Sequence, residues 1–529
     1  MKKIVLLFLF VFSLSLNAQY LRVYFIDKGE NSALVKNPYR FLSSKSIALK
    51  AKRGISINQS DVPVSNVYVK ALQEAGAEVK LSSRWFNYAL VSGVNQKVLE
   101  QFYFVKEVEK VSGGTLAVSA VSQAKGTQAL TYGESDNQIK MVRGDFLHDQ
   151  NFLGQGMTIA VIDGGFSGAT NAKGLDSVWA QNRVLGTYDF VQNDTDVFDV
   201  GSHGTKVFSI MAGIYPNHFV GSAPKANYWL LKSEDEISEH PIEMDYWLQA
   251  AEFADSVGVD VINSSLGYNL FDDPSFNMSY QDLDGNTALI TKAADKAAEK
   301  GILVVVSAGN EGLDAWKHIG APADGDSVLS VGAVDYTGSY VAFSSQGPTA
   351  DGRLKPDVSA RGAATAFLGL DSALNGNGTS FSSPIIAGLA ACLWQCNDSL
   401  SNMTILNAIK QGASQPFTPD NLLGFGIANF KDAHWTIGLE DELESTLPFK
   451  IVGNPATSFV SIKFSPEVVS ANRQLQLWQL DGKPIQQWPI NNSNESIVWD
   501  LPREDGLYMI GIYINGEMYV QKLKVENGK

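Results

Sequence analysis

The chain has 529 residues, of which 45% are hydrophobic and 18% are charged. This length exceeds that of one compact domain, and this composition excludes a disordered or fibrous chain. The formal net charge of −15 argues against a nucleic acid as the partner, because surfaces that bind nucleic acids are basic.

The first 18 residues have the pattern of a secretory signal peptide. A basic start, Met1-Lys2-Lys3, is followed by an apolar run from Ile4 to Leu16 and by small residues that end at Ala18. The apolar run is shorter than the roughly 20 residues of a membrane-spanning helix, although an N-terminal anchor is the alternative. The pattern predicts cleavage after Ala18 and a secreted protein, extracellular or at the cell surface.

Residues 19–130 are predicted to form a small α+β domain. The patterns follow one another as strand 20–26, helix 61–75, strand 79–81, strand 85–91, helix 95–102 and strand 105–111. This β-α-β-β-α-β order is that of a ferredoxin-like fold. From residue 112 to residue 136 small and polar side chains dominate, as in a linker where proteolytic cleavage takes place.

The charges of the chain are divided unevenly between this leader and the segment that follows it. Residues 19–130 contain 15 Lys and Arg against 8 Asp and Glu, whereas residues 131–445 contain 16 against 40. A basic leader next to an acidic segment is expected if one docks on the other, although an acidic surface can also serve solubility alone.

Residues 131–445 are predicted to form an α/β domain with a doubly wound, mostly parallel sheet. Strand patterns at 157–163, 228–231, 259–263, 302–306 and 328–331 alternate with helical patterns after His203, at 244–254, at 288–299 and after Ser380. Alternation of this kind gives a parallel sheet with helices on both faces.

In that fold, four polar side chains are expected at one edge of the sheet. Asp163 and Asn310 follow strands, and His203 and Ser380 lie at the starts of helices. A serine needs a base to take its proton, a histidine can be that base, an aspartate can hold the imidazole ring, and an amide can bind an oxyanion. Taken singly, Ser380 can also be read as a helix cap and His203 as a core histidine.

The segments around these residues resemble the motifs of the subtilisin-like serine peptidases, or subtilases. The matching pieces are Val161-Ile162-Asp163, His203-Gly204-Thr205, Ser307-Ala308-Gly309-Asn310 and Gly378-Thr379-Ser380-Phe381-Ser382-Ser383-Pro384. The resemblance implies a serine endopeptidase in which Asp163 orients His203, His203 is the general base, and Ser380 attacks the scissile carbonyl. It further implies that Asn310 donates to the oxyanion and that Ser265-Leu266-Gly267 is a strand that binds the substrate.

The same resemblance implies the partners and the mode of synthesis. Protein or peptide substrates would bind the cleft, and residues 19–130 resemble a subtilase propeptide, which assists folding and keeps the enzyme as a zymogen. Two positions depart from the family pattern: Gly164 stands where Ser or Thr is usual, and Phe381 stands where methionine is common. Neither change removes a catalytic group.

This chemistry requires no cofactor and no metal. Calcium as a structural ion is an alternative at Asp282-Leu283-Asp284-Gly285-Asn286, but a solvated turn is favoured because the glutamate of a helix-loop-helix calcium loop is missing. Cys392 and Cys396 lie four residues apart on a predicted helix, which favours two small buried thiols over a disulfide.

Residues 446–529 are predicted to form a small β-sandwich. Apolar residues alternate there, and Asp481-Gly482 and Asn515-Gly516 are hairpin signals. The succession of Asn454-Pro455, Asp481-Gly482-Lys483, Gly506-Leu507-Tyr508 and Lys522-Leu523-Lys524-Val525 resembles the C-terminal sorting domain of type IX secretion substrates in Bacteroidetes-type bacteria. That resemblance implies that the tail engages the secretion machinery. The alternative is an accessory β-domain that stabilises the enzyme or binds carbohydrate.

Two other functions stay open at this point. A catalytically silent surface or adhesion protein on the subtilase scaffold would have an unreactive Ser380. A serine hydrolase that acts on esters would use the same four residues, but the Ser265-Leu266-Gly267 strand favours peptides, because a strand pairs with a peptide backbone.

Overall fold

The computed structural model describes residues 18–113, 131–416 and 418–437, together with the strands 449–452, 459–464, 473–479, 484–490, 496–500, 506–514 and 517–525. The chain divides into two compact units, Met1–His434 and Trp435–Lys529. Residues 1–17 of the predicted signal peptide, residues 114–130 of the predicted linker, Asn454-Pro455 and both predicted hairpin turns lie outside the described residues. Within the described ranges, no helix is both long enough and apolar enough to cross a membrane.

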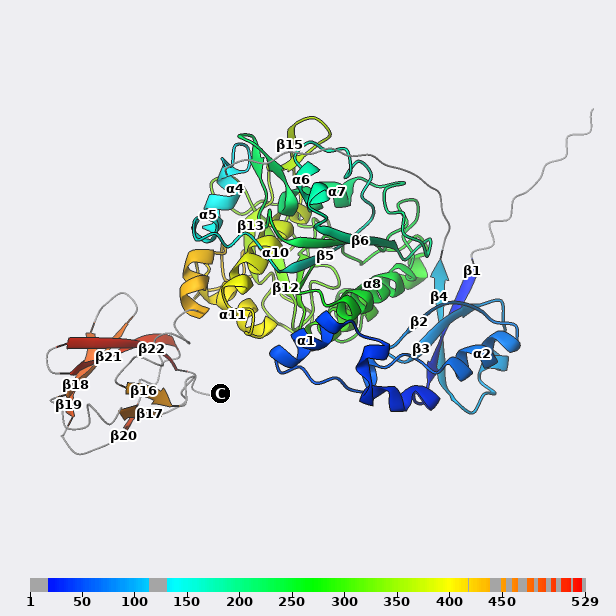
Figure 1. The fold of residues 1–529 in the computed structure, drawn as a ribbon, viewed down its shortest axis with the longest axis horizontal. Coiled ribbons are helices and arrows are strands. Elements are labelled where there is room, and N and C mark those ends of the chain that lie inside the picture. The colour runs from blue at the N-terminus through cyan, green and yellow to red at the C-terminus, as the bar shows by residue number, and fades with distance from the viewer. Residues whose placement is uncertain are drawn as a thin grey trace, which may run out of the picture. The chain divides into compact units, whose positions relative to one another are not determined.

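The leader forms a four-stranded antiparallel sheet with helices (Figure 1). Its elements are β1 (Ala18–Phe25), α1 (Ser44–Lys52), α2 (Asn66–Glu74), β2 (Glu78–Ser83), β3 (Tyr88–Ser92), α3 (Gln96–Leu99) and β4 (Val105–Gly113), with 3-10 turns at Gly29–Lys36, Pro38–Arg40 and Gln59–Asp61. The spatial order β2-β3-β1-β4 is the ferredoxin-like arrangement predicted from the sequence. Helix α1 is an addition to that pattern and was not predicted.

The two faces of the leader sheet are buried against different partners, because successive side chains of a strand point to opposite faces. In β3, Ala89 and Val91 belong to the leader's own core, together with Leu72 of α2. Tyr88 and Leu90 instead belong to the larger core that contains the helices of the following segment. The sheet therefore docks on the rest of the unit through one whole face.

That following segment, residues 131–434, is built on a seven-stranded parallel sheet. In spatial order its strands are β13 (Val358–Arg361), β12 (Leu329–Val334), β11 (Leu303–Ser307), β10 (Val261–Ser264), β5 (Thr158–Asp163), β9 (Asn227–Lys232) and β6 (Val184–Asp189). Helices α7 (His203–Ala212) and α10 (Thr379–Cys396) pack together on one face, and α8 (Glu243–Val257) and α9 (Leu289–Glu299) pack on the other (Figure 1). The predicted doubly wound sheet is confirmed, although its edge strands β6 and β13 were not predicted.

Shorter elements complete the segment. They are α4 (Asp136–Met141), α5 (Gly144–Asp149), α6 (Asp176–Ala180), β7 (Ile214–Tyr215), β8 (Phe219–Val220), β14 (Thr365–Leu368), β15 (Ala373–Gly376) and α11 (Asn402–Gly412), with 3-10 turns at Pro274–Phe276 and Tyr280–Asp282. All six residues of the central strand β5 are buried, which explains why its sequence is a continuous apolar run that ends in Asp163.

Ion pairs join the basic leader to the acidic segment. The shortest pairs with buried carboxylates of the segment are Arg22–Asp245, Lys50–Asp255, Arg84–Asp255 and Arg53–Asp260, with nitrogen-to-oxygen distances of 2.5–2.7 Å. The guanidinium of Arg22 bonds both carboxylate oxygens of Asp245. The docking expected from the charge asymmetry is thus present in the structure.

The second compact unit consists of antiparallel strands. Strands β16 (Phe449–Val452), β17 (Phe459–Phe464) and β20 (Ser496–Asp500) form one sheet, and β18 (Arg473–Gln479), β19 (Pro484–Ile490), β21 (Gly506–Ile514) and β22 (Glu517–Val525) form another. Alternate side chains are buried in both sheets, such as Ile462 and Phe464 in β17 and Leu475 and Leu477 in β18. Two antiparallel sheets with buried faces are the architecture of a β-sandwich.

Candidate active site

Asp163 and His203 are held together at the carboxyl end of the central strand. Asp163 is the last residue of β5 and is fully buried, and His203 is the first residue of α7. His203 Nδ1 lies 2.7 Å from Asp163 Oδ1, and the Gly164 N–H donates to the same oxygen at 2.9 Å. The negative charge of Asp163 raises the pKa of His203 above its ordinary value, although burial opposes this effect.

Ser380 is the second residue of α10 and is hydrogen-bonded to Ser265, the residue that follows β10. Its hydroxyl donates a long hydrogen bond, 3.4 Å, to the Ser265 carbonyl oxygen. Its own carbonyl oxygen accepts a bond of 3.0 Å from Ser265 Oγ. The helix cannot use this carbonyl in the usual way, because the residue four positions on is Pro384, which has no N–H. Pro384 lies inside the helix, beyond its first turn.

His203 lies beside the start of α10. Its ring is nearly parallel to that of Phe381, the residue after Ser380, with ring centres 6.1 Å apart and an interplanar angle of 25°. Among the described residues, no hydrogen bond joins His203 to Ser380. Catalytic hydrogen bonds are often long or poorly aligned before substrate binds, so the absence of this bond is compatible with a catalytic pair.

Asn310 is oriented by the first residue of α10. Its Oδ1 accepts hydrogen bonds from the backbone N–H of Thr379 at 2.9 Å and from Thr379 Oγ1 at 3.2 Å. Since the amide oxygen is engaged, the Nδ2 donors are left for another acceptor. Gly378, with φ of +147°, leads the chain into the helix at this point, and a side chain there would be strained.

Two cavities share the residues Ser265-Leu266-Gly267, which directly follow β10 and are not themselves part of a strand in the structure, contrary to the prediction. The smaller one, about 120 Å³, also contacts Ser380 and Asn310. The larger one, about 500 Å³, contacts Asp163 and His203 and is closed on its far side by residues 234–239 and Asp272. Every predicted site residue therefore lines one or the other of two cavities that have residues 265–267 in common.

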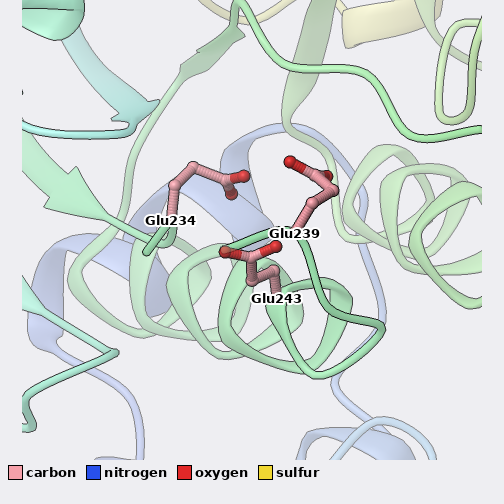
Figure 2. Close-up of side chains that lie close together, drawn as sticks. All are labelled: Glu234, Glu239 and Glu243. Atoms are coloured by element: carbon pink, nitrogen blue, oxygen red, sulfur yellow. The ribbon is translucent and has the colours of Figure 1, made fainter. Parts of the chain in front are cut away.

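The acidic loop that closes the larger cavity was not predicted to belong to the site. Figure 2 shows the carboxylates of Glu234, Glu239 and Glu243 turned toward one another, and their oxygens lie within 4.8 Å. Burial raises the pKa of Glu239 to about 7, of Glu234 to about 8 and of Glu243 to about 10, and neighbouring carboxylates add to the effect. The available signal was the run Glu234-Asp235-Glu236 directly after a parallel strand, where such sheets bind ligands.

The remaining sequence candidates lie away from the cleft. Asp284 accepts hydrogen bonds from the backbone N–H groups of Asn286 and Thr287 at 2.8 and 2.7 Å, which is the geometry of a turn before α9. Cys392 and Cys396 are both free thiols, as predicted from their spacing. Burial raises the pKa of the Cys396 thiol to about 12, so it stays protonated and unreactive at neutral pH.

Comparison with known proteins agrees with this architecture. A family model described as "Subtilase family" matches residues 154–426, and one described as "Peptidase S8 propeptide domain, Bacteroidota" matches residues 20–128. Subtilisin E of Bacillus subtilis is 30% identical over 339 residues, which cover 61% of this chain and 80% of that protein. The subtilisin of Bacillus pumilus is 31% identical over 290 residues, which cover 54% of this chain and 92% of that protein.

Among solved structures, MycP1 from Mycobacterium smegmatis is similar, with 24% identity and a TM-score of 0.43, over 59% of this chain and 88% of that one. The match to the subtilase model covers more than half of the present chain, and the match to the propeptide model covers most of its leader. The chain belongs to the subtilase family of serine endopeptidases, and its leader is a propeptide domain of that family.

Proposed function

We propose that the protein is a secreted serine endopeptidase, made as a zymogen, that uses Asp163, His203 and Ser380 as a catalytic triad and Asn310 as oxyanion donor. The proposal is carried by one observation: the 2.7 Å contact between His203 and Asp163 lies beside the helix that presents Ser380. Membership of the subtilase family supplies the reaction class.

In the proposed reaction, Ser380 Oγ attacks the scissile carbonyl carbon while His203 Nε2 takes its proton. Asp163 stabilises the imidazolium that forms, and the oxyanion accepts hydrogen bonds from Asn310 Nδ2 and the Ser380 N–H. His203 then gives the proton to the departing amine, and water releases the acyl group by the same route. The segment Ser265-Leu266-Gly267 pairs with the peptide on the acyl side of the scissile bond.

The test is covalent labelling of the nucleophile. A fluorophosphonate should attach to Ser380 of the wild-type enzyme, identified by mass spectrometry of the labelled peptide, and Ser380→Ala should abolish both labelling and peptide hydrolysis. Ser372→Ala, which changes an exposed serine nearby, serves as the matched control and should behave as wild type. Normal peptide hydrolysis by Ser380→Ala would reject the proposal and favour another use of the scaffold.

The zymogen part of the proposal is supported by the leader's position. The strand β4 ends beside the acidic loop, where the Ile242 N–H donates to the Ser112 carbonyl oxygen at 3.3 Å, so the chain leaves the leader next to the cleft. If maturation is autocatalytic, Ser380→Ala should accumulate with the leader attached. Gel analysis with N-terminal sequencing would distinguish this outcome from cleavage by another protease.

The secretion part of the proposal assigns residues 1–18 to a signal peptide, 19–130 to the propeptide, 131–445 to the peptidase and 446–529 to a sorting domain. The support is the signal-like N-terminus and the sandwich architecture of the tail. Mass spectrometry of the secreted form should show that residues 1–18 are absent, and deletion of 446–529 should keep the protein inside the cell envelope.

Any calcium bound at 282–286 would have a structural role, since the chemistry takes no cofactor.

A further inference from the structure

The loop that closes the larger cavity is held in a fixed position. It connects the end of β9 at Lys232 to the start of α8 at Glu243. The Glu243 carboxylate accepts hydrogen bonds from the backbone N–H groups of Asp235 and His240, at 2.8 and 2.9 Å. Because both ends of the loop are tied to one side chain, its acidic residues form a built wall of the cleft.

This wall gathers carboxyl groups that have no ion-pair partner among the described residues. The carboxylates that contact the cavity, besides that of Asp163, are Glu234, Asp235, Glu236, Glu239 and Asp272. None of these five takes part in an ion pair within the described ranges. Glu234 keeps only 8% of its surface exposed and is bonded by neutral hydroxyls, those of Tyr268 and Ser233.

Other buried carboxylates of the same unit are paired with cations. Asp189 and Asp199 share Lys232, at 2.9 and 3.1 Å. Asp357 lies between Lys355 and Lys410, at 2.7 and 2.8 Å. A buried carboxylate without a cation is costly, so the unpaired group in the cleft is suited to a positive charge that arrives with a ligand.

The position of the cavity shows which part of a substrate would meet this charge. The smaller cavity, with Ser380 and Asn310, lies where the residue that bears the attacked carbonyl must sit. Residues 265–267 line the larger cavity as well, together with the acidic loop. A peptide extended along these residues advances about 3.3 Å per residue, so the residues that precede the attacked one reach the acidic wall.

We propose that the cleft selects peptides with lysine or arginine on the acyl side of the scissile bond, N-terminal to the residue in the smaller cavity, through Glu239, Asp272 and Glu234. The proposal rests on the peptidase function proposed above. The raised pKa values of Glu239 and Glu234 agree with it, since these carboxylates repel one another when no cation separates them. Both ammonium and guanidinium groups would relieve this repulsion with charge-assisted hydrogen bonds.

The test compares matched peptides and reads a ratio of rates. Each peptide carries Lys, Gln or Glu at one of the four positions before the attacked residue, and kcat/KM is measured with enzyme matured from the full-length chain. At one or more positions other than the one nearest the scissile bond, Lys should exceed Gln by about tenfold or more, because a close charge pair in a desolvated site is commonly worth at least that factor. Glu should be the poorest.

Variants assign the preference to the wall. Glu239→Gln and Asp272→Asn should each lower the Lys-to-Gln ratio severalfold, and Glu239→Lys should reverse it in favour of Glu. Glu299→Gln, on the exposed face of α9, removes the same charge far from the cleft and should keep the wild-type ratio. Thermal unfolding of each variant checks that it is folded.

The outcomes distinguish the proposed selectivity from the proposed peptidase function on which it rests. Equal rates for Lys, Gln and Glu peptides, with normal fluorophosphonate labelling of Ser380, would overturn the selectivity and leave the peptidase function intact. A Lys preference that persists in both Glu239→Gln and Asp272→Asn would also overturn the selectivity. The same holds if the wild-type enzyme binds calcium, Glu239→Gln loses this binding, and the rates for the three peptides are equal. Absence of both labelling and hydrolysis would instead reject the peptidase function.

Discussion

At the residue scale, the protonation of His203 depends on Asp163. The carboxylate raises the pKa of the imidazole, and a general base works only when it is unprotonated. Activity is therefore expected to be full above the raised pKa and to be lost as pH falls through it. Asp163→Asn removes the charge, so the acid limb of kcat/KM should move to lower pH, while kcat should fall by about 10⁴, as in the serine-protease triad generally. A pH–rate profile on one neutral peptide checks both effects.

Asn310 offers a second prediction at this scale. Asn310→Ala removes the proposed oxyanion donor and should lower kcat by about 10²–10³ with little change in KM. Asn310→Asp keeps an oxygen acceptor for the Thr379 N–H but has no donor, so it should lose a comparable factor without loss of stability. Steady-state kinetics together with thermal unfolding separates the two roles, and an unaffected kcat in both variants would exclude Asn310 from the oxyanion site.

The sequence was informative about these residues for a physical reason. Asp163 ends a buried apolar run and His203 and Ser380 begin helices, so local patterns fix where each side chain leaves its element. The acidic loop was missed because Glu234 and Glu239 lie in an irregular segment, and only the folded chain shows that they line the same cavity as residues 265–267. A charge run in a loop reads as a solvated surface until its neighbours are known.

At the scale of elements, the start of α10 is held by a hydrogen bond from the Ser265 hydroxyl to the Ser380 carbonyl oxygen. Pro384 leaves this carbonyl without a donor from within the helix. Ser265→Ala leaves the Ser380 carbonyl without its donor and should lower the free energy of unfolding by about 1–3 kcal/mol. Pro384→Ala restores an N–H four residues after Ser380, so in the Ser265→Ala background it should recover part of the loss. Urea unfolding of the single and double variants measures this coupling, and strict additivity would contradict it.

Elements that depend on tertiary contacts were the ones that the sequence did not reveal. Helix α1 has Ser46 and Lys50 buried, because it packs on α8 and pairs Lys50 with Asp255. Strands β6 and β13 form the edges of the parallel sheet, and four of the six residues of β6 are only partly buried while Leu185 is exposed. The sequence of β6 therefore lacks the continuous apolar run that identifies the central strands, whereas β13 is buried but short and contains Ser359 and Arg361.

At the scale of the whole molecule, buried ion pairs hold the leader on the peptidase. Arg22→Met leaves Asp245, which is fully buried, without its cation, and such a loss commonly costs about 2–5 kcal/mol. The full-length variant should therefore release its leader earlier and show a shorter activation lag. Lys70→Met, which changes an exposed lysine of α2, should keep the wild-type lag. Progress curves of peptide hydrolysis during maturation give this measurement, and equal lags would refute the role of the pair.

The short segment between β9 and α8 touches both the leader and the cleft. Its Ile242 N–H holds the last strand of the leader, while its acidic side chains face the cavity beside His203. An engineer who exchanges residues 233–242 to redirect cleavage should thus expect the timing of activation to shift as well. Substrate preference and the timing of leader release are therefore coupled through this one segment.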